Sequence, residues 1–89
     1  MSSLRVLTEV GTDDLSNKMF LREIIINPDH VAMIREDPLL RRKLVSANSW
    51  PEGLDDRAQF CKVHLNSSTG LTVVNVVGDL SLVVQKLGS

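Results

Sequence analysis

The pattern of the stretch IIINPDHVAMIRED, residues 24–37, predicts a strand, a sharp turn and a second strand. Pro28 has no N–H for a sheet ladder and fixes φ near about −65°, which suits the second position of a type I turn. Asn27 and Asp29 have side chains that bond nearby backbone amides in turns. We therefore interpret Asn27, Asp29 and His30 as turn residues, in preference to a ligand or metal cluster.

Further strands are predicted on either side of this turn from runs of alternating and β-branched apolar residues. Met19–Ile26 is apolar on both faces, which predicts a strand that lies centrally or is covered on both sides. A hairpin loop with a glycine near its end is predicted at residues 66–70. The predicted strands are residues 4–10, 19–26, 31–35, 58–65 and 71–77.

Two helices are predicted from capping and spacing. Asp37 followed by Pro38 has the order of an N-cap and a first helical residue, which predicts a helix over Pro38–Ser46. Its leucines at helical spacing, which we expect to face the body, are Leu39, Leu40 and Leu44. A second, amphipathic helix is predicted after the cap Asp79, ending at Gly88 and docked on the sheet through Leu80, Val83, Val84 and Leu87.

The chain of 89 residues is predicted to form one domain, residues 1–89. The fold class is α+β: an antiparallel β meander of four to five strands with a C-terminal helix and a short helical insertion. The insertion, residues 36–57, separates strands that a short turn would join. Because long connections in small domains tend to be functional, we expect a short Asn-Gly turn in its place to leave a folded domain without its partner.

The composition and charge of the chain argue against several classes of protein. Three aromatic residues leave an aliphatic core, and one cysteine excludes an internal disulfide. The formal net charge of −1 provides no global field for nucleic acid or an anionic membrane. The first ten residues have no signal-peptide pattern, and no stretch approaches the ~18 apolar residues of a membrane span. The expected location is cytoplasmic, or the host cytoplasm or a particle if the protein is viral.

The order of these segments resembles the small flagellar FlbD-like proteins and similar short bacterial and phage proteins. The matching residues are Ile26-Asn27-Pro28-Asp29, Val31, Ile34, Val63-His64-Leu65, Gly70, Val74, Val76 and residues 79–87. The resemblance covers roughly residues 19–35 and 58–87, and it implies a fold but no activity. The chain departs from the FlbD-like pattern by the long insertion at residues 36–57, where that family has a short turn.

No catalytic residue, cofactor or metal is predicted, and the protein is not expected to be an enzyme. Cys61 and His64 are three apart in a strand, so they point to opposite faces and cannot share one ion. Cys61 is interpreted as a buried apolar residue. The acidic pairs Asp13-Asp14 and Asp55-Asp56 are interpreted as solvated loop residues. The sequence contains no Gly-rich phosphate loop, no Ser-centred elbow and no HExxH.

The residues predicted to bind a partner are Arg35, Arg41, Arg42, Lys43 and Trp50. The alternative for the basic cluster, Arg41, Arg42 and Lys43 with Arg35 upstream, is that its side chains are only a solvated helix face. Trp50 either folds back on the core or anchors an interface. The first hypothesis is a non-enzymatic protein–protein interaction or assembly module, as a homo-oligomer or a subunit of a bacterial or phage complex. The alternative is a small nucleic-acid-binding or transcription-modulating protein that uses the basic helix; nucleic acid is the less favoured partner.

Overall fold

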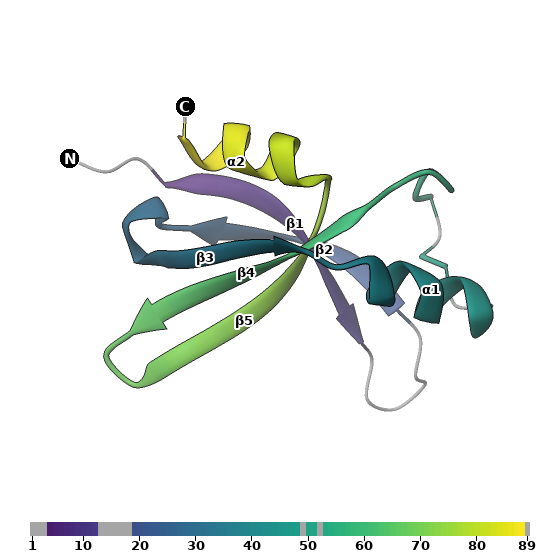
Figure 1. Ribbon diagram of the computed structural model, residues 1–89, viewed down its shortest axis with the longest axis horizontal. Coiled ribbons are helices and arrows are strands. Elements are labelled where there is room, and N and C mark those ends of the chain that lie inside the picture. Colours follow the sequence, from purple (N-terminus) through teal and green to yellow (C-terminus); the bar gives the residue numbers. More distant parts are fainter. Residues whose placement is uncertain (1–3, 13–18, 49, 52, 89) are drawn as a thin grey trace.

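The computed structural model describes residues 4–12, 19–48, 50–51 and 53–88. It is an α+β fold with a five-stranded antiparallel sheet and two α-helices, as predicted. In chain order the elements are β1 (Arg5–Thr12), β2 (Met19–Ile26), the short 3-10 helix η1 (Pro28–His30), β3 (Val31–Glu36), α1 (Pro38–Ser46), β4 (Phe60–Ser67), β5 (Gly70–Val77) and α2 (Leu80–Gly88) (Figure 1).

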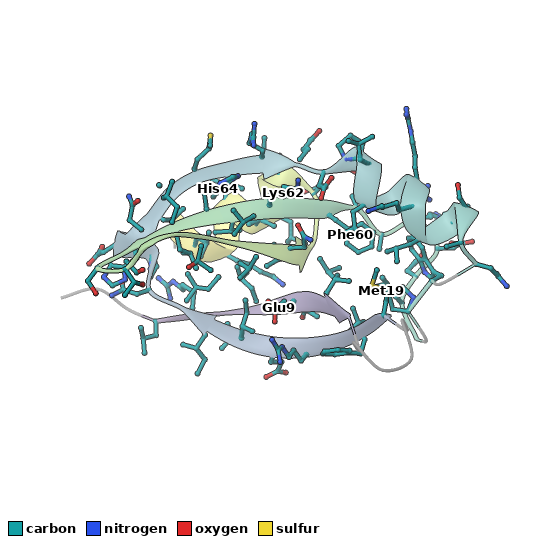
Figure 2. All side chains as sticks on the ribbon, turned by 90° about the horizontal axis from the view of Figure 1, so that it is seen from below. Glu9, Met19, Phe60, Lys62 and His64 are labelled. Carbon is teal, nitrogen blue, oxygen red and sulfur yellow. The ribbon has the colours of Figure 1, made fainter. Side chains whose placement is uncertain are left out.

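The strand order across the sheet is β2-β1-β5-β4-β3. The consecutive strands β3, β4 and β5 form a meander, and β1 and β2 form a hairpin. The two groups are joined through β1 and β5 at the pair Glu9 and Val76, where the strands cross. In Figure 2 the β1–β2 hairpin forms the lower layer and the meander the upper layer, so the sheet is strongly curled.

The turn at residues 27–30 is built as the sequence predicts. The Asn27 side chain accepts a hydrogen bond from the Asp29 backbone N–H at 3.0 Å, and the His30 N–H donates to the Asn27 carbonyl at 3.0 Å. Pro28 occupies the first turn of η1. The Asn27 side chain therefore has its predicted role in the turn that links β2 to β3. Asp29 takes part through its backbone N–H, and its side chain forms no hydrogen bond with another described residue.

The prediction that β2 is central or covered on both sides is wrong, because β2 lies at one edge of the sheet. Ile25 and Phe20, on opposite faces of this strand, are both exposed. The connection through η1 is short, yet β2 and β3 lie at opposite edges. This is possible because the curl of the sheet brings the ends of the two edge strands together.

The core is divided into two clusters on opposite faces of the sheet. Successive residues of a strand face opposite sides, so Phe60 and Cys61 of β4 enter different clusters. The cluster between α2 and the sheet consists of Leu7, Ile26, Cys61, Val63 and Val76 with Val83 and Leu87 of the helix. The cluster between α1 and the sheet consists of Val10 and Phe60 with Leu40 and Leu44 of the helix, and Trp50, Leu54 and Val77 pack against it. In Figure 1, α2 lies at the upper left and α1 at the right. Because each helix covers a different face of the sheet, β4 has buried apolar residues on both faces.

Both α-helices begin at the predicted caps. Asp37 accepts a hydrogen bond from the Leu40 N–H at 3.2 Å, and Asp79 accepts one from the Leu82 N–H at 2.8 Å. The predicted docking faces are wider than the observed ones. Leu39 of α1 is 65% exposed, and Leu80 and Val84 of α2 are also exposed. A short helix over a curved sheet contacts the sheet along a narrow stripe. The buried residues are therefore only Leu40 and Leu44 in α1, and Val83 and Leu87 in α2.

The β4–β5 hairpin is tighter than predicted. The ladder continues to the pair Ser67 and Gly70, so the loop consists of Ser68 and Thr69 and not of residues 66–70. The Ser67 hydroxyl donates to the Gly70 carbonyl at 2.9 Å, and Gly70 has a positive φ of 123°. A left-handed region of this kind favours glycine, so the sequence signal for the turn was real while its length was misjudged. Likewise, β4 begins at Phe60 and not at residue 58.

Candidate interaction surface

One side of the β3–β4–β5 meander is turned away from the β1–β2 hairpin. Figure 2 shows Lys62 and His64 of β4 projecting on this side. The strand register places Arg35 and Asn75 beside Lys62, and Met33 and Val73 beside His64. We call this surface the outer face; its residues are Met33, Arg35, Lys62, His64, Asn66, Leu71, Val73 and Asn75.

The outer face is bordered by α1, and a hollow of about 750 Å³ lies between them. Lys62 and Asn75 line it from the sheet, and Arg42 and Lys43 line it from the helix. Its apolar wall is formed by Leu39 and Leu40. The hollow thus brings together cations from two elements that are far apart in the sequence.

Four cations lie on or beside the outer face: Arg35, Lys62, Arg42 and Lys43. None of them forms an ion pair or side-chain hydrogen bond with another described residue. By contrast, the Nε atom of Arg22 lies 2.6 Å from the Oε1 atom of Glu9 and forms an ion pair with it. Since the formal net charge of the chain is −1, the remaining side chains together carry a formal charge of −5. These four cations nonetheless have no counter-ion among the described residues.

The acid that borders the hollow does not neutralise these cations. Asp37 is 7% exposed, and its carboxylate accepts the N–H of Leu40 at the start of α1. Its own N–H donates to the Phe60 carbonyl at 2.9 Å. Asp37 therefore fixes α1 against β4 and positions the basic residues that follow it in the helix.

Two buried polar atoms on this face have no hydrogen-bond partner among the described residues. They are the Asn75 Oδ1 atom and the His64 Nε2 atom. A buried polar atom without a partner costs free energy of about 1–3 kcal/mol in the folded state. A molecule bound at this face would recover part of that cost once the side chain turned the atom toward it.

Two of the residues predicted to bind a partner are used in the scaffold. Arg41 donates to the carbonyls of Asp56 at 2.6 Å and Ala58 at 3.3 Å, and its guanidinium lies 5.5 Å from the centre of the Trp50 ring. Trp50 packs edge-on against Phe60, with ring centres 5.7 Å apart. Its indole N–H donates to the Leu54 carbonyl at 2.9 Å. Trp50 therefore folds back on the core, which was one of the two predicted alternatives.

Of the other three predicted residues, Arg35 lies on the outer face and Arg42 and Lys43 lie beside it on α1, next to residues that sequence reasoning did not select. These are Lys62, Leu71 and Val73, of which Leu71 is 67% exposed and Val73 is 49% exposed. The alternation of β4 and β5 held the signal, because it places Lys62 on the face opposite the buried Cys61 and Val63. The same alternation in β5, paired with β4 in the hairpin, also places Leu71 and Val73 on the face of Lys62.

Cys61 is buried beneath α2, as predicted, and its Sγ atom lies 3.3 Å from the Gly78 carbonyl. His64 projects from the other side of β4, so the two side chains do not converge. In the parts of the chain that the structure describes, no group of three or more His, Cys, Asp or Glu side chains could hold a metal ion. Asp55 and Asp56 are exposed in a turn, and Asp13 and Asp14 lie outside the described residues.

We expect Cys61 to react slowly with a thiol reagent in native buffer. Burial raises the pKa of its thiol, and the nearby carboxylates of Glu36, Asp79 and Asp37 raise the pKa further. The thiolate is the reactive form, so both burial and pKa slow the reaction. The thiol reagent should label Cys61 at the rate of an unfolded chain only when denaturant is present. Rapid labelling of the folded protein would contradict the core assignment.

The same pKa shift predicts a loss of stability at alkaline pH. The folded-state pKa of Cys61 is raised, so its contribution is fully present below the unfolded pKa and is lost as pH rises through the folded pKa. The melting temperature should therefore fall at alkaline pH, and less steeply in Cys61→Ala. Parallel pH profiles of the two proteins would show that Cys61 is not the cause.

Comparison with known proteins gave no match to a family model, to a curated protein or to a solved structure. The resemblance to FlbD-like proteins therefore stays a prediction. Among the helices of the described residues, none is long and apolar enough to cross a membrane.

Proposed function

We propose that this protein is a non-enzymatic interaction module that assembles with another protein chain through its outer face. The partner is a second copy of the chain or another subunit of a bacterial or phage complex. The observation that carries the proposal is a combination of two features on or beside the outer face: exposed apolar side chains, and four cations without an ion-pair partner among the described residues.

The apolar part of the outer face supports an assembly role. Leu71 and Val73 of β5 and Met33 of β3 are exposed on the same side of the sheet. Clustered exposed apolar side chains with a polar rim are typical of protein–protein interfaces. The helices leave this part open, because α2 packs on the opposite side and α1 covers only the end near Phe60.

We expect the double substitution Leu71→Ser and Val73→Ser to abolish assembly and leave the fold intact. Both side chains are largely exposed, so the loss of stability should stay within about 1 kcal/mol. Sedimentation over a range of concentrations would measure self-association. Co-expression with the products of neighbouring genes would measure binding to another subunit.

The matched control is Leu82→Ser, which removes an exposed apolar side chain from α2 on the other side of the molecule. It should leave mass and partner binding unchanged. If the double variant keeps the sedimentation behaviour and the co-purification of the parent, the outer face is not the interface. A parent protein that stays monomeric and binds none of these products also removes the proposal.

Nucleic acid is the second candidate, and the four cations on or beside the outer face are the observation in its favour. Phosphate contacts make affinity fall steeply with salt, so a shift assay at low and moderate salt discriminates the two functions. Base stacking is not provided by Trp50, whose ring packs on Phe60. Tight binding of DNA or RNA that weakens with salt and is lost in Arg42→Glu would favour this second function.

A further inference from the structure

We infer that the segment held at the hollow between α1 and the outer face is an extended, acidic stretch of a protein partner. This inference rests on the proposed interaction function and adds the chemistry of the partner. Its elements are the cations of the hollow, its apolar wall and the unpaired amide oxygen of Asn75.

The cations at the hollow favour a negatively charged ligand. Lys62 from β4 and Arg42 with Lys43 from α1 border the same hollow, and none has an acidic partner within the described part of the chain. Opposite charge on a partner would supply the missing counter-ions and fix its register. The hollow is bordered by three cations from two elements, so a short acidic segment is enough to supply a counter-ion to each of them.

Hydrogen bonding distinguishes a peptide from a phosphate backbone. The Asn75 Oδ1 atom is buried at the hollow and accepts from no described donor. An extended peptide offers backbone N–H donors beside its carboxylates, whereas a DNA backbone offers acceptors only. A peptide can therefore satisfy the cations and, once the Asn75 side chain turns its amide oxygen toward the hollow, that oxygen as well. A DNA backbone satisfies only the cations.

The dimensions and lining of the hollow are compatible with such a segment. Its volume of about 750 Å³ falls within the range of about 300–1,000 Å³ that is usual for binding pockets. Leu39 and Leu40 form an apolar wall next to the cations. Leu39 gains a role by this inference, since it is a large exposed side chain that does not contribute to the core. A peptide that alternates acidic and apolar residues matches both parts of the lining.

The test is a nuclear magnetic resonance titration of the intact protein with a short synthetic peptide that alternates glutamate and leucine. Backbone amide shifts should concentrate at Arg42, Lys43, Lys62 and Asn75. The matching peptide with glutamine in place of glutamate should have a dissociation constant at least about tenfold higher, because its charge-assisted hydrogen bonds to the cations are lost. A single-stranded DNA of similar length is titrated in parallel.

Charge reversal locates the site. We expect Arg42→Glu and Lys62→Glu each to raise the dissociation constant of the glutamate peptide about tenfold or more. Lys86→Glu, an exposed residue of α2, makes the same charge change away from the hollow and should leave affinity within about twofold. Arg42 is exposed, so its variant remains informative if Lys62→Glu lowers stability.

Each other outcome counts against the inference. Shifts outside the hollow, equal binding of the glutamine peptide, or tighter binding of the DNA would overturn the acidic-peptide chemistry. If the peptide does not bind while Leu71→Ser with Val73→Ser still abolishes assembly, the proposed function stands and only this inference fails. If the double variant assembles normally, the proposed function fails independently of the peptide result.

Discussion

Val83→Asp is expected to unfold the protein at neutral pH. Val83 is a residue of α2, is 0% exposed, and packs in the cluster that contains Leu7, Val63 and Val76. A carboxylate placed there loses its hydration and has no partner, which costs several kcal/mol. A domain of this size has a total stability near the low end of about 5–15 kcal/mol. Circular dichroism should show no cooperative melting transition, or one far below that of the parent.

The matched control is Val84→Asp, the next residue of the same helix. Val84 is 49% exposed, so its carboxylate stays hydrated and the melting temperature should fall by only a few degrees. Leu80, which the sequence placed on the docking face, is exposed and should tolerate the same change better than Val83. If Val83→Asp melts within a degree of the parent, α2 is not docked and the fold described above is wrong.

Leu44→Ala is expected to lower the free energy of unfolding by about 2–5 kcal/mol, the range for a buried leucine replaced by alanine. Leu44 is 1% exposed and packs in the cluster of Val10, Leu40 and Phe60. In a domain of this length such a loss corresponds to a fall of roughly 10 °C or more in melting temperature. Urea denaturation would measure it directly.

Leu39→Ala is the control on the same helix, since Leu39 is exposed to solvent. Its effect on unfolding should stay within about 0.5 kcal/mol, as for other surface substitutions. Equal effects of the two substitutions would mean that α1 is not oriented as described. A loss of peptide binding in Leu39→Ala without a loss of stability would support the role of its side chain in the hollow.

The burial of α1 changes the expectation for the insertion. From the sequence, a short turn in place of residues 36–57 should leave a folded domain. In the structure this segment supplies Leu40 and Leu44 to the core and covers Phe60 with Trp50. We therefore expect the replacement to expose Phe60 and destabilise the domain. The insertion is part of the scaffold, and point substitutions at Arg42 and Lys43 are the cleaner way to test its surface.

The proposed function and the inference about the partner depend on the same arrangement of α1 and β4. Asp37 caps the helix and also binds the Phe60 backbone, so it holds the basic helix beside Lys62. The apolar residues of β5 extend the same face beyond the hollow. A partner segment that follows this face would meet cations first and then Leu71 and Val73.

Local features were predictable because their causes are local in the chain. The turn at Asn27 and Pro28 and the bounds of α1 follow from capping, proline geometry and residue spacing, which act over a few residues. The opposite orientation of Cys61 and His64 follows from the twofold period of a strand. Those features, the burial of Cys61 and the α+β class were determined by the sequence alone.

The neighbours of each strand were decided only by the tertiary structure. Backbone hydrogen bonds between strands are the same for any residue, so alternation indicates which face is apolar but not which strand lies alongside. The pairing of β1 with β5 and the edge position of β2 therefore had no readable signal. The packing of Trp50 and the meeting of Lys62 with Arg42 and Lys43 depend on how the curled sheet seats α1 over Phe60, a contact between segments far apart in the chain.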